Sequence, residues 1–114
     1  CDWSSDVCSS DLDFVDYKSA EITDNYTYPC VLPNWDNTPR CGLSGYVLTD
    51  STPEIFKCYF SNGIDKVSLL DFDQRIIFIK SWNEWAEGNY LEPDQVYGCK
   101  YLQAIKDTIY TNEK

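Results

Sequence analysis

The spacing of hydrophobic residues predicts a strand followed by a helix in the first half of the chain. Tyr28–Pro33 is a short apolar run bounded by prolines, which is typical of a strand. A polar, glycine-containing loop over Asn34–Thr49 follows. Thr52 then offers an N-cap with Pro53 at the first helical position, so we expect a helix from here to about Leu70. Its apolar residues recur at helical spacing: Ile55, Phe56, Tyr59, Phe60, Ile64 and Val67.

The same alternation repeats in the second half. Arg75–Lys80 is a nearly continuous apolar run rich in β-branched residues, which predicts a strand covered on both faces, as in a parallel sheet. Ser81–Tyr97 contains Gly88 and Pro93 and is predicted to be a loop. Helical spacing resumes over Gly98–Tyr110, through Tyr101, Leu102, Ile105 and Ile109.

The order strand, loop, helix, occurring twice, predicts an α/β fold made of two β/α units. Parallel strands joined by helices cross over with one hand, so both post-strand loops should lie at the same edge of the sheet. In a (β/α)8 barrel of the TIM type that edge is the C-terminal face, where active sites lie. A whole barrel typically needs about 250 residues, so a chain of 114 residues is too short to close one.

Composition excludes several kinds of chemistry. The formal net charge is −10 and the chain has no His, so there is no basic surface for nucleic acid or anionic lipid. Without His, Ser-His-Asp and Cys-His catalysis within this chain are excluded, and we expect neither a metal site nor another cofactor. Any acid–base chemistry must therefore use carboxylates, Tyr or Lys. No apolar run approaches the roughly 20 residues of a membrane-spanning helix.

The six cysteines lack the spacing of a metal or redox site. They occupy positions 1, 8, 30, 41, 58 and 99 and form no C-x-x-C pair. A disulfide framework is conceivable, but incidental reduced thiols fit this content better. We therefore expect a cytoplasmic protein.

The first twelve residues differ from the rest of the chain. Residues 1–12 read CDWSSDVCSSDL and resemble the translation of a sequencing-library adapter, which matches ten consecutive residues from Asp2 to Asp11. We expect this segment to be an artefact and residues 13–114 to be the native part. Removing it takes away three aspartates, so the net charge of −10 becomes −7.

The two post-strand loops hold most of the residues suited to chemistry. Glu84 and Glu87 are three residues apart, so one turn after the strand would bring both carboxylates to one point. Glycosidic chemistry requires such a pair, one acid and one base or nucleophile. Aromatic residues beside them offer flat faces on which the C–H faces of a sugar ring pack. The alternative is that both glutamates are solvated charges and that Trp82 and Trp85 pack the end of the sheet.

A family resemblance covers essentially residues 13–114. Residues 82–105, WNEWAEGNYLEPDQVYGCKYLQAI, resemble the C-terminal motif of the WbsX glycosyltransferase family, also described as glycoside hydrolase family 99-like. The segments PNWDNTPRCG and STPEIF are similar to the family's preceding segments. The resemblance implies the C-terminal two β/α units of a (β/α)8 barrel and a role in lipopolysaccharide or capsular polysaccharide synthesis. The hydrolase relatives are endo-acting α-mannosidases and mannanases.

The resemblance also assigns residues. By position, Glu84 matches the hydrolase base that acts on the sugar 2-hydroxyl, and Glu87 matches the acid/base on the glycosidic oxygen. Three residues depart from the pattern. Cys41 stands where many relatives have a second Arg, Lys80 where a small or amide residue is commoner, and Ala86 where the hydrolases have His. The last departure weakens the transfer of the hydrolytic mechanism.

Other residues of the two loops are candidate glycan contacts, and each also has a structural interpretation. Asp36 and Asn37 could instead stabilise their loop through an Asx turn, and Arg40 could form a surface ion pair. Tyr90 could be a packed loop residue, and Glu92 is better explained by structure than by catalysis, since Pro93 fixes the loop around it. The full set of candidate substrate contacts is Trp35, Asp36, Asn37, Arg40, Trp82, Asn83, Trp85, Tyr90 and Glu92.

Three functions follow from this set. The leading hypothesis is a WbsX-like glycosyltransferase acting on a glycan or sugar donor in the parent protein, with the 114-residue chain inactive by itself. The first alternative is a retaining endo-glycosidase that uses Glu84 and Glu87. The second is a non-catalytic glycan-binding module, which would tolerate the loss of a carboxylate.

Overall fold

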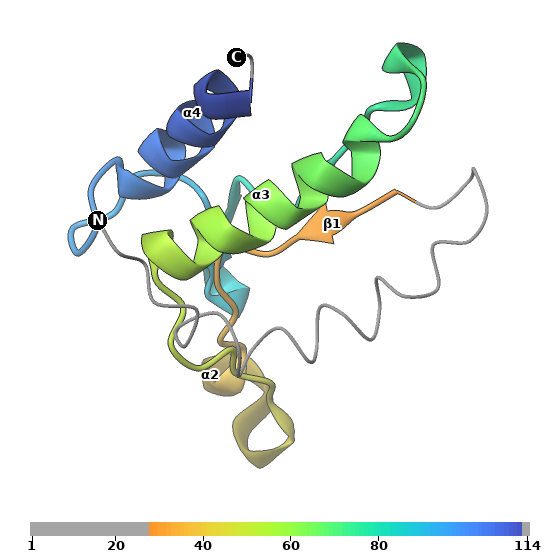
Figure 1. Cartoon of the computed structure of the whole chain (residues 1–114). Coiled ribbons are helices and arrows are strands. Elements are labelled where there is room, and N and C mark those ends of the chain that lie inside the picture. Colours follow the sequence, from red (N-terminus) through yellow and green to blue (C-terminus); the bar gives the residue numbers. More distant parts are fainter. Residues whose placement is uncertain (1–27, 113–114) are drawn as a thin grey trace.

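The computed structural model describes residues 28–112, so the adapter-like segment 1–12 lies outside the described residues. The described chain is a mixed α/β structure in which helix α3 crosses the β1 strand and helix α4 lies beside α3 (Figure 1). The elements in chain order are β1 (Cys30–Val31), α2 (Thr38–Cys41), η1 (Gly42–Ser44), α3 (Pro53–Ser68), η2 (Phe72–Gln74), β2 (Phe78–Ile79), β3 (Asn83–Glu84), η3 (Trp85–Glu87), β4 (Asn89–Tyr90) and α4 (Lys100–Asn112).

The predicted parallel pairing of the two strands is confirmed. Strands β1 and β2 are parallel neighbours, with Cys30 opposite Phe78 and Val31 opposite Ile79. The pairing is only two residues long because prolines flank β1. The Pro29 carbonyl accepts a hydrogen bond from Phe78 N at 2.9 Å, but a proline nitrogen has no hydrogen to donate to a ladder.

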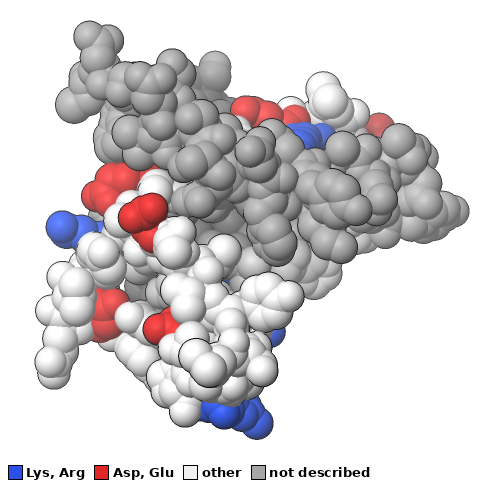
Figure 2. All heavy atoms as spheres, turned by 90° about the horizontal axis from the view of Figure 1, so that it is seen from below, with Lys and Arg blue, Asp and Glu red and all other residues white. Residues whose placement is uncertain are grey.

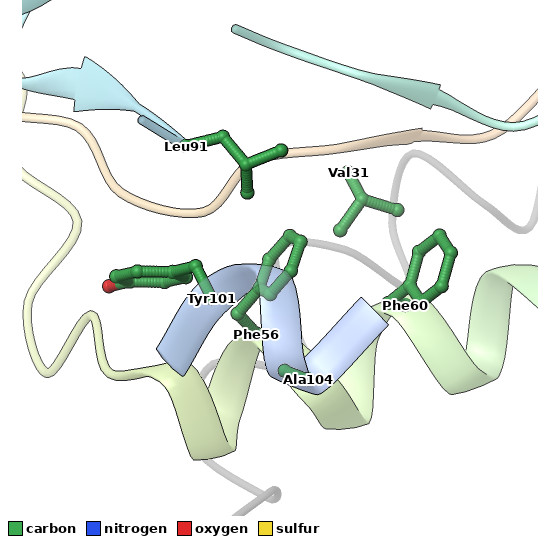
Figure 3. Packing of buried hydrophobic residues seen from close by; sticks show 6 residues of the cluster. All are labelled: Val31, Phe56, Phe60, Leu91, Tyr101 and Ala104. Atoms are coloured by element: carbon green, nitrogen blue, oxygen red, sulfur yellow. The ribbon is translucent and has the colours of Figure 1, made fainter. Parts of the chain in front are cut away.

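Helix α3 begins where its sequence predicts and ends at Ser68, two residues before the predicted end. The Thr52 hydroxyl accepts a hydrogen bond from Ile55 N at 3.3 Å, and Pro53 is the first helical residue. The buried face of α3 packs on β1 and on α4. Figure 3 shows the aromatic rings of α3 pointing toward Val31 and Leu91, which lie on the side of the strands. The core residues are Val31, Phe56, Phe60, Leu91, Tyr101 and Ala104.

Helix α4 buries a slightly different face from the one predicted. Tyr101, Ala104 and Thr108 are buried, whereas Ile109 is exposed. The small Ala104 side chain faces the core and lets α4 approach α3 closely. The ring of Tyr101 meets Phe56 edge-on, with 5.5 Å between centroids. The hydrophobic spacing therefore located the helix correctly, while one residue assigned to its buried face is exposed.

The prediction that residues 75–80 are covered on both faces is wrong for the described chain. Ile77 and Ile79 pack against the core on the side of α3. The side chains at the alternate positions of this strand face away from α3, and Phe78 has 56% of its surface exposed. The reason is that the described helices cover a single face of the two-stranded sheet.

The two segments predicted to be loops contain regular structure. The first folds into α2 and η1, and its ends are joined by a bridge between Asp36 and Val47. The second leaves β2 through a cis peptide bond between Lys80 and Ser81 and forms the antiparallel β3–β4 hairpin around η3. Periodicity misses such elements because each is two to four residues long.

Charged side chains of both signs lie on the described surface (Figure 2). Figure 2 views one face from below and shows acidic and basic side chains scattered among the described residues rather than gathered in one basic patch. Within residues 28–112, neither long helix combines the length and the apolar character needed to cross a membrane.

Candidate functional site

The two post-strand segments lie together at the carboxyl ends of β1 and β2, as predicted, and a buried amide joins them. Asn89 is fully buried. Its Nδ2 donates to the carbonyl oxygens of Asn34, at 2.7 Å, and Lys80, at 2.9 Å. In return, the Asn34 side-chain oxygen accepts a hydrogen bond from Tyr90 N at 2.8 Å. One side chain therefore connects the ends of both strands to the hairpin.

A direct backbone contact brings the first segment against the hairpin. Asp36 N donates to the Glu87 carbonyl at 3.0 Å. The next residue, Gly88, has a left-handed backbone with φ +53°, and a Cβ at this position would lie 2.7 Å from the Asp36 carbonyl oxygen. Only glycine meets both requirements without displacing backbone. The position of Glu87 is thus fixed through its main chain.

Glu84 and Glu87 lie at the two ends of one 3₁₀ turn. Glu84 is the last residue of β3 and is exposed, and Glu87 is the last residue of η3. Ser81 supports the start of this turn, because its hydroxyl accepts from Glu84 N at 3.2 Å and donates to the Asn89 carbonyl at 2.8 Å. Both glutamate residues therefore belong to a single turn of the chain.

The Glu87 carboxylate lies between two cations. Arg40 Nη1 is 3.6 Å from Glu87 Oε1, and Lys80 Nζ is 3.8 Å from Glu87 Oε2. The Lys80 ammonium also lies 4.1 Å from the centre of the Trp35 ring, within the range of a cation–π contact. The side chain of Glu87 is 25% exposed, against 66% for Arg40 and 48% for Lys80. The carboxylate therefore lies beneath two more accessible cations.

An aromatic stack stands next to the glutamates. The rings of Trp85 and Tyr90 are nearly parallel, at 22°, with centroids 3.9 Å apart. Trp85 Nε1 donates to Glu92 Oε2 at 2.8 Å, which fixes the indole and gives Glu92 the structural role expected of it. The Trp82 carbonyl accepts from Leu91 N and Glu92 N, while the Trp82 side chain is half exposed. This Trp85–Tyr90 stack offers an oriented, partly open indole surface.

The Tyr90 hydroxyl remains protonated over a wide range of pH. Burial raises the pKa of Tyr90, and the nearby Asp94 carboxylate adds to this effect. Burial also tends to raise the pKa of Asp94, but hydrogen bonds from the backbone N–H groups of Tyr97 and Val96 outweigh it and leave the Asp94 pKa below its usual value. Tyr90 is thus a packed residue of β4 whose phenol donates a hydrogen bond to Asp94.

Asp36 and Asn37 stabilise their own segment. Asp36 Oδ1 accepts from Thr38 N at 3.0 Å and from the Thr38 hydroxyl at 2.5 Å, which is the Asx turn expected as the structural alternative. These hydrogen bonds, the hydroxyl first, lower the pKa of Asp36. Asn37 Oδ1 accepts from Tyr46 N at 2.6 Å. Arg40 differs from both, because its ion pair is with a candidate catalytic residue.

Comparison with known sequences identifies the family. Residues 7–105 match the profile of the family described as Glycosyltransferase WbsX, a match that begins inside the adapter-like segment. The chain belongs to this family. The family is described as one of glycosyltransferases.

Relatives with 32% identity support the assignment. They are two proteins, each described as "Uncharacterized protein WxcX", from the strains B100 and ATCC 33913 of Xanthomonas campestris pv. campestris. Each aligns over 95 residues, which is 82% of this chain. The chain spans 14% of the length of these curated relatives. No solved structure matches the chain.

Within this WbsX-family chain, the structure adds site residues that the sequence did not indicate. Lys80 and Asn89 reach the site from the end of β2 and from β4, and Asn34 completes the junction between them. Lys80 could have been proposed from the sequence, because it is a charged residue at the end of an apolar run. Asn83, a predicted contact, is exposed on β3. Residues 28–112 contain no group of three or more metal-ligating side chains placed to hold an ion.

Proposed function

We propose that this chain is the C-terminal part of a glycosyltransferase with a (β/α)8 barrel, and that Glu84 and Glu87 are its catalytic pair. The enzyme would transfer a sugar during the assembly of cell-surface polysaccharide, either lipopolysaccharide or capsule. The WbsX family membership supports sugar transfer, and the short coverage of the WxcX relatives supports a longer parent protein.

The observation that carries the proposal is the position of Glu87. Its carboxylate lies where two post-strand segments meet, with Glu84 one turn away and the Trp85–Tyr90 stack beside it. A carboxylate pair can accept a proton from a hydroxyl and stabilise the positive charge that develops on a sugar ring. The stack offers an apolar face to the same ring.

Two features favour transfer over hydrolysis. A hydrolase of this type needs a protonated acid on the glycosidic oxygen, whereas Glu87 is paired with Arg40 and Lys80. Ala86 also replaces the His expected of the hydrolases.

The test is the turnover of the full-length enzyme, expressed from the intact gene. Glu87→Gln keeps the shape of the side chain and removes its ability to take a proton, so turnover should fall by roughly 10²–10⁴ while substrate still binds. Glu84→Gln should be comparably damaging. Glu54→Gln, an exposed glutamate at the start of α3, is the matched control and should retain wild-type turnover. Product formation is measured by mass spectrometry of the glycosylated acceptor.

Each rival function has its own outcome in this assay. Cleavage of an intact glycan without any sugar donor, abolished by either glutamine variant, would replace transfer with the endo-glycosidase. Wild-type turnover in both glutamine variants would show that Glu84 and Glu87 are not the catalytic pair. Glycan binding without any turnover would leave the binding module.

A further inference from the structure

We propose that Arg40 and Lys80 form a phosphate-binding site for an activated sugar donor, and that Glu87 occupies this site until the donor arrives. The inference rests on the proposed glycosyl transfer and names its substrate class, a sugar joined through C1 to a phosphate or diphosphate. Arg40 and Lys80 are called the cation pair below.

The geometry of the cation pair suits a single anion with several oxygens. Each cation contacts a different oxygen of Glu87, at 3.6 Å and 3.8 Å, so both lie within reach of one anionic group. These distances are longer than the roughly 2.7–2.9 Å of a charge-assisted hydrogen bond. Neither cation is therefore tightly hydrogen-bonded to the carboxylate, and a better-fitting oxyanion can displace it.

The cation pair comes from two separate elements and remains accessible. Arg40 lies in the last turn of α2, and Lys80 directly follows β2. Three contacts position the lysine. Its ammonium lies over the Trp35 ring, its backbone N donates to the Val31 carbonyl, and its carbonyl accepts from the Asn89 side-chain amide. The Arg40 side chain is 66% exposed and the Lys80 side chain 48%, so a phosphate can approach without displacing the core.

Charge favours an anionic ligand at this place over others on the chain. The chain carries a net charge of −10, which repels anions in general. Here two cations meet one carboxylate that contacts both of them. The guanidinium of Arg40 presents a planar set of donors that matches phosphate oxygens, and Lys80 adds a point charge. Both are ordinary components of phosphate sites.

The proposed step balances without a further reactant. The bond between C1 and the donor phosphate oxygen breaks, and its electron pair leaves on that oxygen, where the cation pair stabilises it. The acceptor hydroxyl oxygen forms the new bond to C1 and gives its proton to the Glu87 carboxylate, which the phosphate has freed from the cations. A phosphate leaving group needs cations instead of a protonated acid, so the paired state of Glu87 is compatible with transfer.

Binding of inorganic pyrophosphate to the full-length enzyme, measured by calorimetry, tests the site without a need to know the sugar. We expect Arg40→Gln and Lys80→Gln each to weaken binding by about tenfold, the usual value of a charged hydrogen bond. Glu87→Gln should strengthen binding by about threefold or more, because the internal competitor loses its charge. Lys57→Gln is the matched control, since Lys57 is also half exposed and pairs with a carboxylate, Asp107, at 4.0 Å. Its affinity should equal that of the wild type.

Two results would overturn the inference: no binding of pyrophosphate by the wild type, or equal binding by the wild type and the cation variants. Its fate is separable from that of the proposed function. One outcome is sugar transfer that needs Glu84 and Glu87 while the KM for the donor is unchanged in Arg40→Gln and Lys80→Gln. It would refute the phosphate site and support the proposed glycosyltransferase. The opposite outcome is an enzyme that binds pyrophosphate in the expected pattern but transfers no sugar. It would support the phosphate site and refute the proposed glycosyltransferase. A second titration uses a nucleoside diphosphate. Tighter binding than that of pyrophosphate would indicate a nucleotide-linked donor, and equal binding would indicate that only the phosphate groups are recognised.

Discussion

Asn89 connects three segments of the chain through one buried amide. Its Nδ2 holds the Asn34 carbonyl after β1 and the Lys80 carbonyl after β2, while its backbone belongs to the hairpin that carries both glutamates. Removing the amide takes a hydrogen-bond donor away from both carbonyl oxygens at once. Positioning of the site therefore depends on a residue that need not touch substrate.

Replacing this amide should destabilise the protein. Asn89→Ala leaves two carbonyl oxygens without their donor and should lower the free energy of unfolding of the full-length enzyme by about 2–4 kcal/mol. Chemical denaturation followed by fluorescence measures the change. Asn83→Ala is the control, because Asn83 is an exposed asparagine of the same hairpin and should change stability by less than about 0.5 kcal/mol. Equal stability of both variants would refute the role of Asn89.

At this scale the sequence predicted the chemical groups better than their partners. Glu84, Glu87 and the neighbouring Trp residues could be identified because two acids among aromatics follow an apolar strand. The pairing of Glu87 with Arg40 could not, because it joins residues 47 positions apart through a contact between loops. Periodicity carries no information about such contacts, which depend on the tertiary arrangement of both segments.

Helix α3 lies against the strands at a glycine. A Cβ added at Gly63 would be 3.5 Å from Ile77 Cδ1 and 3.6 Å from Val31 Cγ2, which are ordinary contact distances. Gly88 is the opposite case, since its backbone is left-handed and its missing Cβ would meet Asp36 backbone atoms at 2.7 Å and 2.9 Å. The two glycines should therefore respond to substitution with opposite signs.

We expect Gly63→Ala to raise the free energy of unfolding of the full-length enzyme by about 0.5–1 kcal/mol, because alanine loses less backbone entropy in a helix. Gly88→Ala should lower it by about 2–4 kcal/mol through the left-handed backbone and the close contact. Urea unfolding of both variants beside the wild type measures the difference. A stabilised Gly88→Ala would show that the hairpin is not held against Asp36 as described.

The sequence predicted helices and parallel strands well because their signals are local and repeated. Thr52, Pro53 and the apolar spacing fixed the start of α3, and two apolar runs located β1 and β2. The β3–β4 hairpin could not be predicted in this way. It has two residues in each strand, and its register depends on Ser81, Gly88 and Asn89 together.

Among residues 28–112, helices cover one face of the β1–β2 sheet and leave the other face open. The open face carries Phe78, 56% exposed, and within the described residues each strand of this two-stranded sheet has one edge without a neighbouring strand. Exposed apolar faces and unpaired strand edges promote association between chains. We propose that further strands and helices of the parent barrel cover this face.

Residues 13–114 expressed alone should therefore aggregate or fold only in part. Light scattering after size exclusion, with a thermal melt, measures both properties. Phe78→Lys should increase the fraction of monomer, because it places a charge on the open face. Tyr110→Lys changes an equally exposed aromatic, 60% exposed, on the far helix α4 and should leave the monomer fraction unchanged. A soluble wild-type monomer with a sharp cooperative melt would contradict the prediction.

The way the two segments are fastened has a consequence for how such sites change during evolution. Most of the junction between the two segments consists of main-chain atoms. They are Asp36 N and the carbonyl groups of Glu87, Asn34 and Lys80, and the one side-chain group is the Asn89 amide. Main-chain bonds survive when outward-facing side chains are exchanged. Positions such as 40, 41 and 86 can therefore diverge between relatives, and with them the choice of sugar or leaving group, while the glutamates keep their places.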